Sequence, residues 1–180
     1  MYTEALFVGM GGQGALLAAQ ILAHAAVHEG KNVVWYPAYG PETRGGTATC
    51  TLIISDEQIG APIAPNPEIL VAFNQTMLDK YINQVKSGGM VIANSDLCKS
   101  IKRDDLTEYS VPASSIALEL GNPKVLNMAM AGALSKVCGC VENESVNWSL
   151  ENQLPEKIKK TIPVNMKALE LGKERVIKTK

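Results

Sequence analysis

The sequence of 180 residues has few aromatic side chains, no marked excess of charge and no very long apolar run. Aromatic residues make up 5% of the chain, although 46% of it is hydrophobic, which is enough to form a core. Seventeen basic side chains stand against eighteen acidic ones, and no basic stripe of the kind that nucleic acids require is present. We therefore expect a folded protein that does not bind nucleic acid.

Targeting and membrane signals are also missing. The N-terminal segment MYTEALFVGM lacks the basic region of a signal peptide, and no apolar run approaches the roughly 20 residues that span a bilayer. The sequence therefore predicts a soluble, cytoplasmic protein with no membrane partner.

Few residues suggest chemistry carried by this chain alone. The four cysteines have no C-x-x-C spacing, so we interpret them as reduced, mostly buried small hydrophobic residues. His24 and His28 lie four residues apart on one predicted helix, but no third metal ligand accompanies them, and a solvated helix edge is favoured. No P-loop and no nucleophile elbow is present, so we expect no catalytic residue and no metal in this chain.

The order of the predicted elements indicates an α/β fold. A strand over 4–8, a glycine turn and a helix over about 14–29 lead to a second strand over 32–36, which completes a β-α-β unit. Further strands are predicted over 48–55, 69–73, 90–95 and 108–113, with helices over 74–85, from 122 to about 137, and within 154–178. We expect one domain over 1–180, a Rossmann-like three-layer α/β/α sandwich with a mixed, mostly parallel sheet.

The first predicted helix is apolar on most of its circumference. Only Gln20, His24 and His28 mark a polar edge, so this helix needs burial on two sides. The sheet can supply one side, and either another helix or a partner chain can supply the other.

The glycine turn spans residues 9–14 and reads Gly-Met-Gly-Gly-Gln-Gly. Its G-x-G-x-x-G spacing matches a dinucleotide fingerprint, and Gly11, Gly12, Gln13 and Gly14 are candidates for binding an anion or for forming the turn. A nicotinamide site usually has an acidic residue at the end of the second strand, and residues 33–39 contain none. The pattern therefore favours a turn that serves close packing over NAD binding.

Several motifs together resemble the gamma subunit of 2-oxoacid:ferredoxin oxidoreductases. They are the glycine turn, YGPETRGGTATC (39–50), NQTMLDKY (74–81), GNPKVLNM (121–128), GAL (132–134) and the C-terminal pattern Asn165-x-x-Ala168-x-x-x-Gly172. The sequence around residues 35–44 is most similar to the 2-oxoglutarate branch of this family, and the 2-oxoisovalerate and pyruvate branches stay open. The motifs span essentially the whole chain.

The resemblance implies a division of labour among subunits. Such enzymes decarboxylate a 2-oxoacid on thiamine diphosphate held through Mg²⁺, pass electrons through iron–sulfur clusters to ferredoxin, and form an acyl-coenzyme A. The thiamine site belongs to alpha and beta subunits, and a delta subunit often carries clusters. This chain would then partner alpha, beta and delta subunits, hold none of these cofactors itself, and support assembly or the coenzyme A end of the reaction.

The second motif supplies the predicted contact loop. Arg44 is the preferred contact residue, since a guanidinium pairs with carboxylate or phosphate, and Gly45 and Gly46 permit close approach. Tyr39, Pro41 and Glu42 complete this loop. An internal Arg44–Glu42 contact is an equally open alternative. We further expect the isolated chain to self-associate through an uncovered apolar patch.

Overall fold

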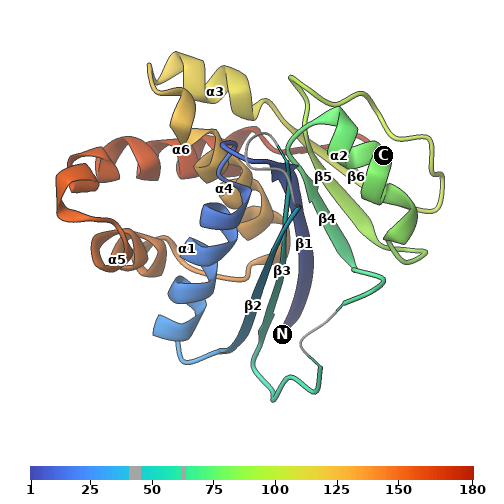
Figure 1. The fold of residues 1–180 in the computed structure, drawn as a ribbon, viewed down its shortest axis with the longest axis horizontal. Helices are drawn as coiled ribbons and strands as arrows, with labels where there is room; N and C mark the ends of the chain where they lie inside the picture. Colours follow the sequence, from blue (N-terminus) through green and yellow to red (C-terminus); the bar gives the residue numbers. More distant parts are fainter. Residues whose placement is uncertain (41–45, 62–63) are drawn as a thin grey trace.

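The computed structural model describes residues 1–40, 46–61 and 64–180, which form a seven-stranded sheet flanked by helices (Figure 1). The strand order is β2-β3-β1-β4-β5-β6-β7. The strands are β1 (Tyr2–Met10), β2 (Asn32–Tyr39), β3 (Thr47–Ser55), β4 (Ile69–Ala72), β5 (Met90–Asn94), β6 (Thr107–Val111) and β7 (Ile177–Lys178).

The sheet is mixed, as the sequence predicted. Strands β1, β4, β5 and β6 run parallel to their neighbours in that series, whereas β3 is antiparallel to both β1 and β2. The antiparallel strand that we expected within 40–55 is thus β3. Because β3 lies between β1 and β2, the β-α-β unit at the N-terminus joins strands that are not hydrogen-bonded neighbours.

Helices cover the two faces of the sheet unequally (Figure 1). One face carries α1 (Ala15–His28), α3 (Ala113–Glu119) and α4 (Leu126–Cys138), with α5 (Asn143–Gln153) and α6 (Ile162–Arg175) outside them. The other face carries α2 (Gln75–Tyr81), which contributes Met77 and Leu78 to a second, smaller core cluster. The three-layer α/β/α prediction is confirmed. No helix in the described ranges is long and apolar enough to cross a bilayer.

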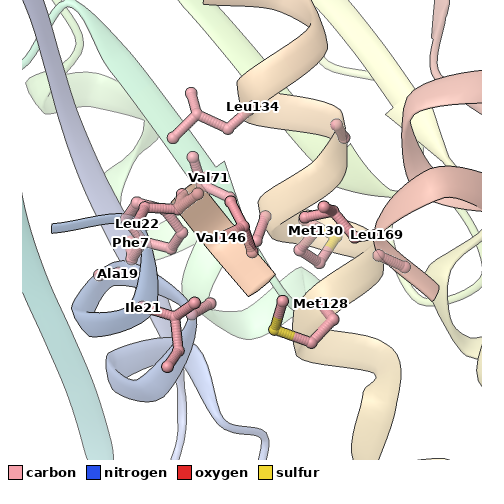
Figure 2. Close-up of a cluster of buried hydrophobic side chains, with 14 of the residues drawn as sticks. Phe7, Ala19, Ile21, Leu22, Val71, Met128, Met130, Leu134, Val146 and Leu169 are labelled. Atoms are coloured by element: carbon pink, nitrogen blue, oxygen red, sulfur yellow. The ribbon is translucent and has the colours of Figure 1, made fainter. Parts of the chain in front are cut away.

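The larger core lies between the sheet and helices α1 and α4, and it continues between α4 and α6 (Figure 2). Phe7 of β1 and Leu22 of α1 are fully buried in it. The outer side of α1 packs against α5, where Ser149 Oγ donates to the Ile21 carbonyl at 2.9 Å. The second cover that the apolar α1 required is therefore a helix of the same chain.

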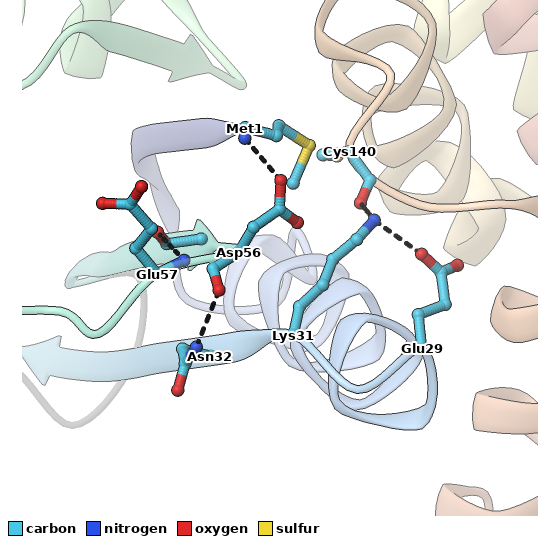
Figure 3. A network of polar contacts seen from close by, with 8 residues as sticks. Met1, Glu29, Lys31, Asn32, Asp56, Glu57 and Cys140 are labelled. Carbon is cyan, nitrogen blue, oxygen red and sulfur yellow. Dashed lines mark hydrogen bonds and ion pairs between the residues drawn. The ribbon is translucent and has the colours of Figure 1, made fainter.

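Polar contacts hold the first residues of β1 and of β2 in place (Figure 3). Lys31 Nζ donates to Glu29 Oε2 at 2.6 Å and to the Cys140 carbonyl at 2.7 Å. The N-terminal ammonium of Met1 pairs with Asp56 just beyond β3. These contacts tie three segments that lie far apart in the sequence.

Candidate functional site

The candidate site lies where the direction of chain winding reverses between β1 and β4. From β1 the chain crosses through α1 to β2 on one side, and from β4 it proceeds to β5 and β6 on the other. The glycine turn follows β1, and Asn74 follows β4, at adjacent carboxyl ends. Ligands of open α/β sheets bind outside the strand ends at this kind of reversal point.

The glycine turn places the N-terminus of α1, which has no side-chain cap, next to the carboxyl end of β1. Gly12 and Gly14 have φ values of 98° and 77°, which side chains other than glycine adopt at a cost. Gly14 is the N-cap of α1; it offers no side-chain acceptor, and no acidic residue lies in the first turn. The first N–H groups of α1 have no acceptor within the helix, and together with the helix dipole they favour an anion here.

Gln13 fastens the turn to the next strand. Its Oε1 accepts from the Met10 N–H at 2.8 Å and from Asn74 Nδ2 at 2.6 Å. Asn74 Oδ1 in turn accepts from the Met77 N–H at 3.0 Å and caps α2. Gln13 is thus a structural link between the glycine turn and α2.

Gly14 packs tightly against the start of α4. A Cβ at Gly14 would lie 2.9 Å from Asn127 Nδ2, and that amide donates to the Gly14 carbonyl at 3.4 Å. Asn127 is 3% exposed, and its Oδ1 has no hydrogen-bond partner among the described residues. Gly14 therefore makes a close contact with α4, of the kind that a packing role for this glycine predicts.

Two of the motifs that led to the family resemblance, the glycine turn and residues 39–50, meet here. The Gly11 N–H donates to the Gly46 carbonyl at 2.9 Å, and the Gly40 N–H donates to the Thr47 carbonyl at 2.8 Å. Tyr39 is 75% exposed beside them. The other predicted loop residues, Pro41, Glu42, Arg44 and Gly45, lie outside the described residues.

A cavity of about 200 Å³ opens next to this loop. Tyr39, Thr47, Thr49, Lys80 and Tyr81 contribute to its lining. Lys80 Nζ donates to Thr47 Oγ1 at 3.3 Å, which brings a cation from α2 to the edge of β3. Sequence reasoning missed Lys80 as a site residue, and its only signal was its place in the NQTMLDKY motif.

The thiols and imidazoles of the chain are not arranged as reactive groups. Burial raises the pKa of Cys50, Cys98 and Cys138 to about 12, so these thiols stay protonated near neutral pH. His28 stacks on Trp148 with ring centroids 4.0 Å apart. His24 instead lines a cavity with Trp35. The described residues contain no group of three or more metal-ligating side chains.

The sheet order bears on nicotinamide binding. In a dinucleotide-binding fold the acidic ribose contact comes from the strand next to β1. Here that neighbour is the antiparallel β3, whose first residue Thr47 pairs with Met10. The strand that follows α1 lies one position further out. The lack of an acidic residue in 33–39 is thus consistent with a sheet order that differs from that of a dinucleotide-binding fold.

Fold and site together define a doubly wound α/β domain. Its glycine turn, the amide side chains of Gln13 and Asn74, and Gly46 of the second motif meet at the carboxyl ends of the central strands β1 and β4. The family model described as pyruvate ferredoxin/flavodoxin oxidoreductase matches residues 4–175, and the chain belongs to this family. The resemblance inferred from the motifs is confirmed.

Individual relatives agree. The chain is 40% identical over 166 residues to ketoisovalerate oxidoreductase subunit VorA of Methanothermobacter marburgensis, covering 91% of this chain and 34% of VorA. It is 37% identical over 179 residues to 2-oxoglutarate synthase subunit KorC of Methanocaldococcus jannaschii, covering 97% of this chain and 96% of KorC. The chain thus spans about a third of the VorA relatives and nearly all of KorC.

A solved structure shares the fold. It is the gamma subunit of a keto/oxoacid ferredoxin oxidoreductase from Geobacter sulfurreducens PCA, with a TM-score of 0.80 and 32% identity over 96% of both chains. The predicted fold class is confirmed by this likeness as well as by the sheet itself.

Proposed function

We propose that this chain is the gamma subunit of a multi-subunit 2-oxoacid:ferredoxin oxidoreductase that converts 2-oxoglutarate to an acyl-coenzyme A and reduces ferredoxin. The observation that carries the proposal is the match to KorC, which aligns with nearly the full length of both chains. Residues 1–180 would form one gamma-type domain, in a cytoplasmic complex. The 40% identity to VorA supports 2-oxoisovalerate as the second candidate substrate.

The reaction chemistry would belong to other subunits. Thiamine diphosphate with Mg²⁺ would be held by alpha and beta subunits, and iron–sulfur clusters by a delta subunit. In support, the potential nucleophiles and metal ligands in the described ranges are mainly buried thiols and an imidazole that stacks on Trp148. These groups are not arranged to react. This chain would contribute a shaped surface and binding groups.

Its binding role would lie at the coenzyme A end of the reaction. The α1 N-terminus at Gly14 favours an anion, and Lys80 brings a positive charge to the neighbouring cavity. Arg44 would add a guanidinium that pairs with phosphate or with a partner's carboxylate. These groups fit a ligand that carries several phosphates.

The experiment is replacement of Arg44 in the reconstituted complex. Arg44→Ala should weaken subunit assembly or raise the apparent KM for coenzyme A, with kcat for the 2-oxoacid less affected. Arg175→Ala is the matched control, because Arg175 is an arginine at the end of α6 that pairs with Glu119 of α3. Normal assembly and normal coenzyme A kinetics in Arg44→Ala would remove Arg44 from the proposed role.

Two other readings are separated by ligand titration of the isolated chain. Tight NAD(H) binding would favour a free-standing nucleotide-binding protein instead. Absence of both NAD(H) and coenzyme A binding, together with intact assembly, would indicate a scaffold that contacts no ligand. The proposal predicts coenzyme A binding that strengthens when the other subunits are present.

A further inference from the structure

Within the described residues, β2 forms a long outer edge of the sheet that has few of the features that usually protect such an edge. β2 is the first strand in the sheet order, and among the described strands it pairs with β3 alone. Its register with β3 runs without a bulge from Asn32 to Tyr39, and the sequence NVVWYPAY carries no charge. Free edges are usually shortened, bulged or charged, because they otherwise pair with other strands. Pro37 is the one such device in β2.

The hydrogen-bond pattern shows which main-chain groups point outward. The Gly40 N–H donates to the Thr47 carbonyl, just beyond the last strand pair. In an antiparallel ladder such pairs recur at every second residue, so Val34, Tyr36 and Ala38 bond to β3. Val33, Trp35 and Pro37 therefore turn their main-chain groups away from the sheet. Pro37, which has no N–H, thus loses no bond to β3.

Apolar side chains flank this edge on both faces. Val33 and Trp35 line a cavity of about 240 Å³ that also includes Val27 of α1. Val34 and Tyr36 point to the opposite face, because successive strand residues alternate. The exposed fractions are 37% for Trp35, 52% for Tyr36 and 57% for Val27. Large side chains of this kind are seldom left together in water.

We propose that the free chain forms a two-fold dimer in which β2 pairs antiparallel with β2 of a second copy, centred on Trp35. The axis then places Trp35 opposite the partner's Trp35. Val34 lies opposite the partner's Tyr36, and Val33 lies opposite the partner's Pro37. An interface of this kind is closed, because each copy uses the same edge.

This register suits the available donors and acceptors. The two Trp35 residues exchange N–H and C=O groups, and each Val33 N–H donates to the partner's Pro37 carbonyl. A register centred on Val34 would instead place Pro37 opposite Lys31, whose N–H already donates to the Ala26 carbonyl. At those two positions of the alternative register neither residue can donate, so the carbonyls of Pro37 and Lys31 stay without a partner across the dimer axis.

The side-chain pairs are favourable as well. Aromatic residues opposite β-branched or aromatic residues stabilise antiparallel pairs, and this register makes two Val34–Tyr36 pairs and one Trp35 pair. The start of β2 is held in place by the Lys31 contacts (Figure 3), so little ordering is needed on association. The edge is therefore self-complementary in both main chain and side chains.

Sedimentation equilibrium on the purified full chain tests the proposal, with hydrogen exchange of the Val33 and Trp35 amides. The wild-type chain should dimerise and protect both amides as concentration rises. Trp35→Lys puts two like charges on the axis and should raise the dimer Kd roughly tenfold or more. Val33→Pro removes an outward N–H without breaking the β3 ladder and should act in the same direction. Leu118→Lys is the control, because Leu118 is 76% exposed on α3, away from this edge.

Three results would overturn the proposal. One is a wild-type chain that stays monomeric at every concentration. Another is a dimer that Trp35→Lys and Val33→Pro leave unchanged, provided that circular dichroism shows both variants folded. The third is protection of the Val33 and Trp35 amides only after the other oxidoreductase subunits are added, which would assign the edge to one of those subunits.

Discussion

Gly12 and Gly14 form a matched pair for testing how the glycine turn is built. Both have positive φ, so alanine at either position carries a backbone cost of about 1–3 kcal/mol. A Cβ at Gly12 meets nothing within 4 Å, whereas a Cβ at Gly14 lies 2.9–3.0 Å from three atoms of Asn127. The difference between the two variants therefore isolates the contact with Asn127.

Overpacking of this kind costs about 1–3 kcal/mol beyond the backbone term. Gly14→Ala should thus unfold at a lower temperature than Gly12→Ala, by about 2–4 °C for each kcal/mol of difference. Paired urea and thermal denaturation curves measure this. Adding Asn127→Ala to Gly14→Ala should restore part of the loss.

Equal destabilisation by Gly12→Ala and Gly14→Ala, within about 0.5 kcal/mol, would show that the contact between Gly14 and Asn127 adds nothing to the backbone cost. It would mean that Asn127 moves aside without cost. The proposed packing role of Gly14 would then be wrong, although both positions would still require a positive φ.

The remaining predictions concern the link at Gln13, the helix contact at Gly132 and the pH dependence of stability. Gln13→Ala removes the acceptor of two hydrogen bonds and should destabilise the chain by about 1–3 kcal/mol in urea unfolding, while an unchanged midpoint would show the link to be unimportant. Gly132→Ala places a Cβ 2.1 Å from the Leu169 carbonyl and should separate α4 from α6 with a clear drop in Tm, whereas Gly60→Ala, with open space around it, should be neutral. Burial raises the pKa of Cys50 from 9.0 to about 12, so the unfolded chain loses that proton first. The contribution of Cys50 to stability should be fully present below about pH 9 and should be lost as pH rises toward 12. Cys50→Ala should make the fall in stability less steep, and Cys98 and Cys138, which have the same shift, should account for the rest of it.

The fold could be anticipated because its signals are local. The glycine turn between an apolar strand and an apolar helix predicted the β1–α1 unit, and the alternation in 48–55 predicted β3. An antiparallel strand was correctly predicted in this region. Its position between β1 and β2 could not be predicted, because it depends on pairing between strands far apart in the sequence. Two helices, α3 and α5, were not predicted, because α5 has a polar sequence and α3 follows directly after Pro112.

The site could be anticipated only in part. Motif positions such as Gly14 and Gln13 were found from spacing, and the structure brings them to one edge. The contacts of Gln13 with Asn74, 61 residues away, and of Gly14 with Asn127 arise from tertiary packing that no local pattern encodes. Lys80 was missed for the same reason, since it lies on α2 and its partner Thr47 lies on β3.

The central claim is that this chain works as one subunit among several, with the chemistry carried by its partners. The most direct measurement is affinity purification of the tagged chain from its native source, followed by protein identification, cofactor analysis and assay across 2-oxoacids. We expect to recover chains that carry thiamine diphosphate and iron–sulfur clusters, with ferredoxin-reducing activity on 2-oxoglutarate. Recovery of this chain alone, or turnover of a 2-oxoacid by the isolated chain, would contradict it.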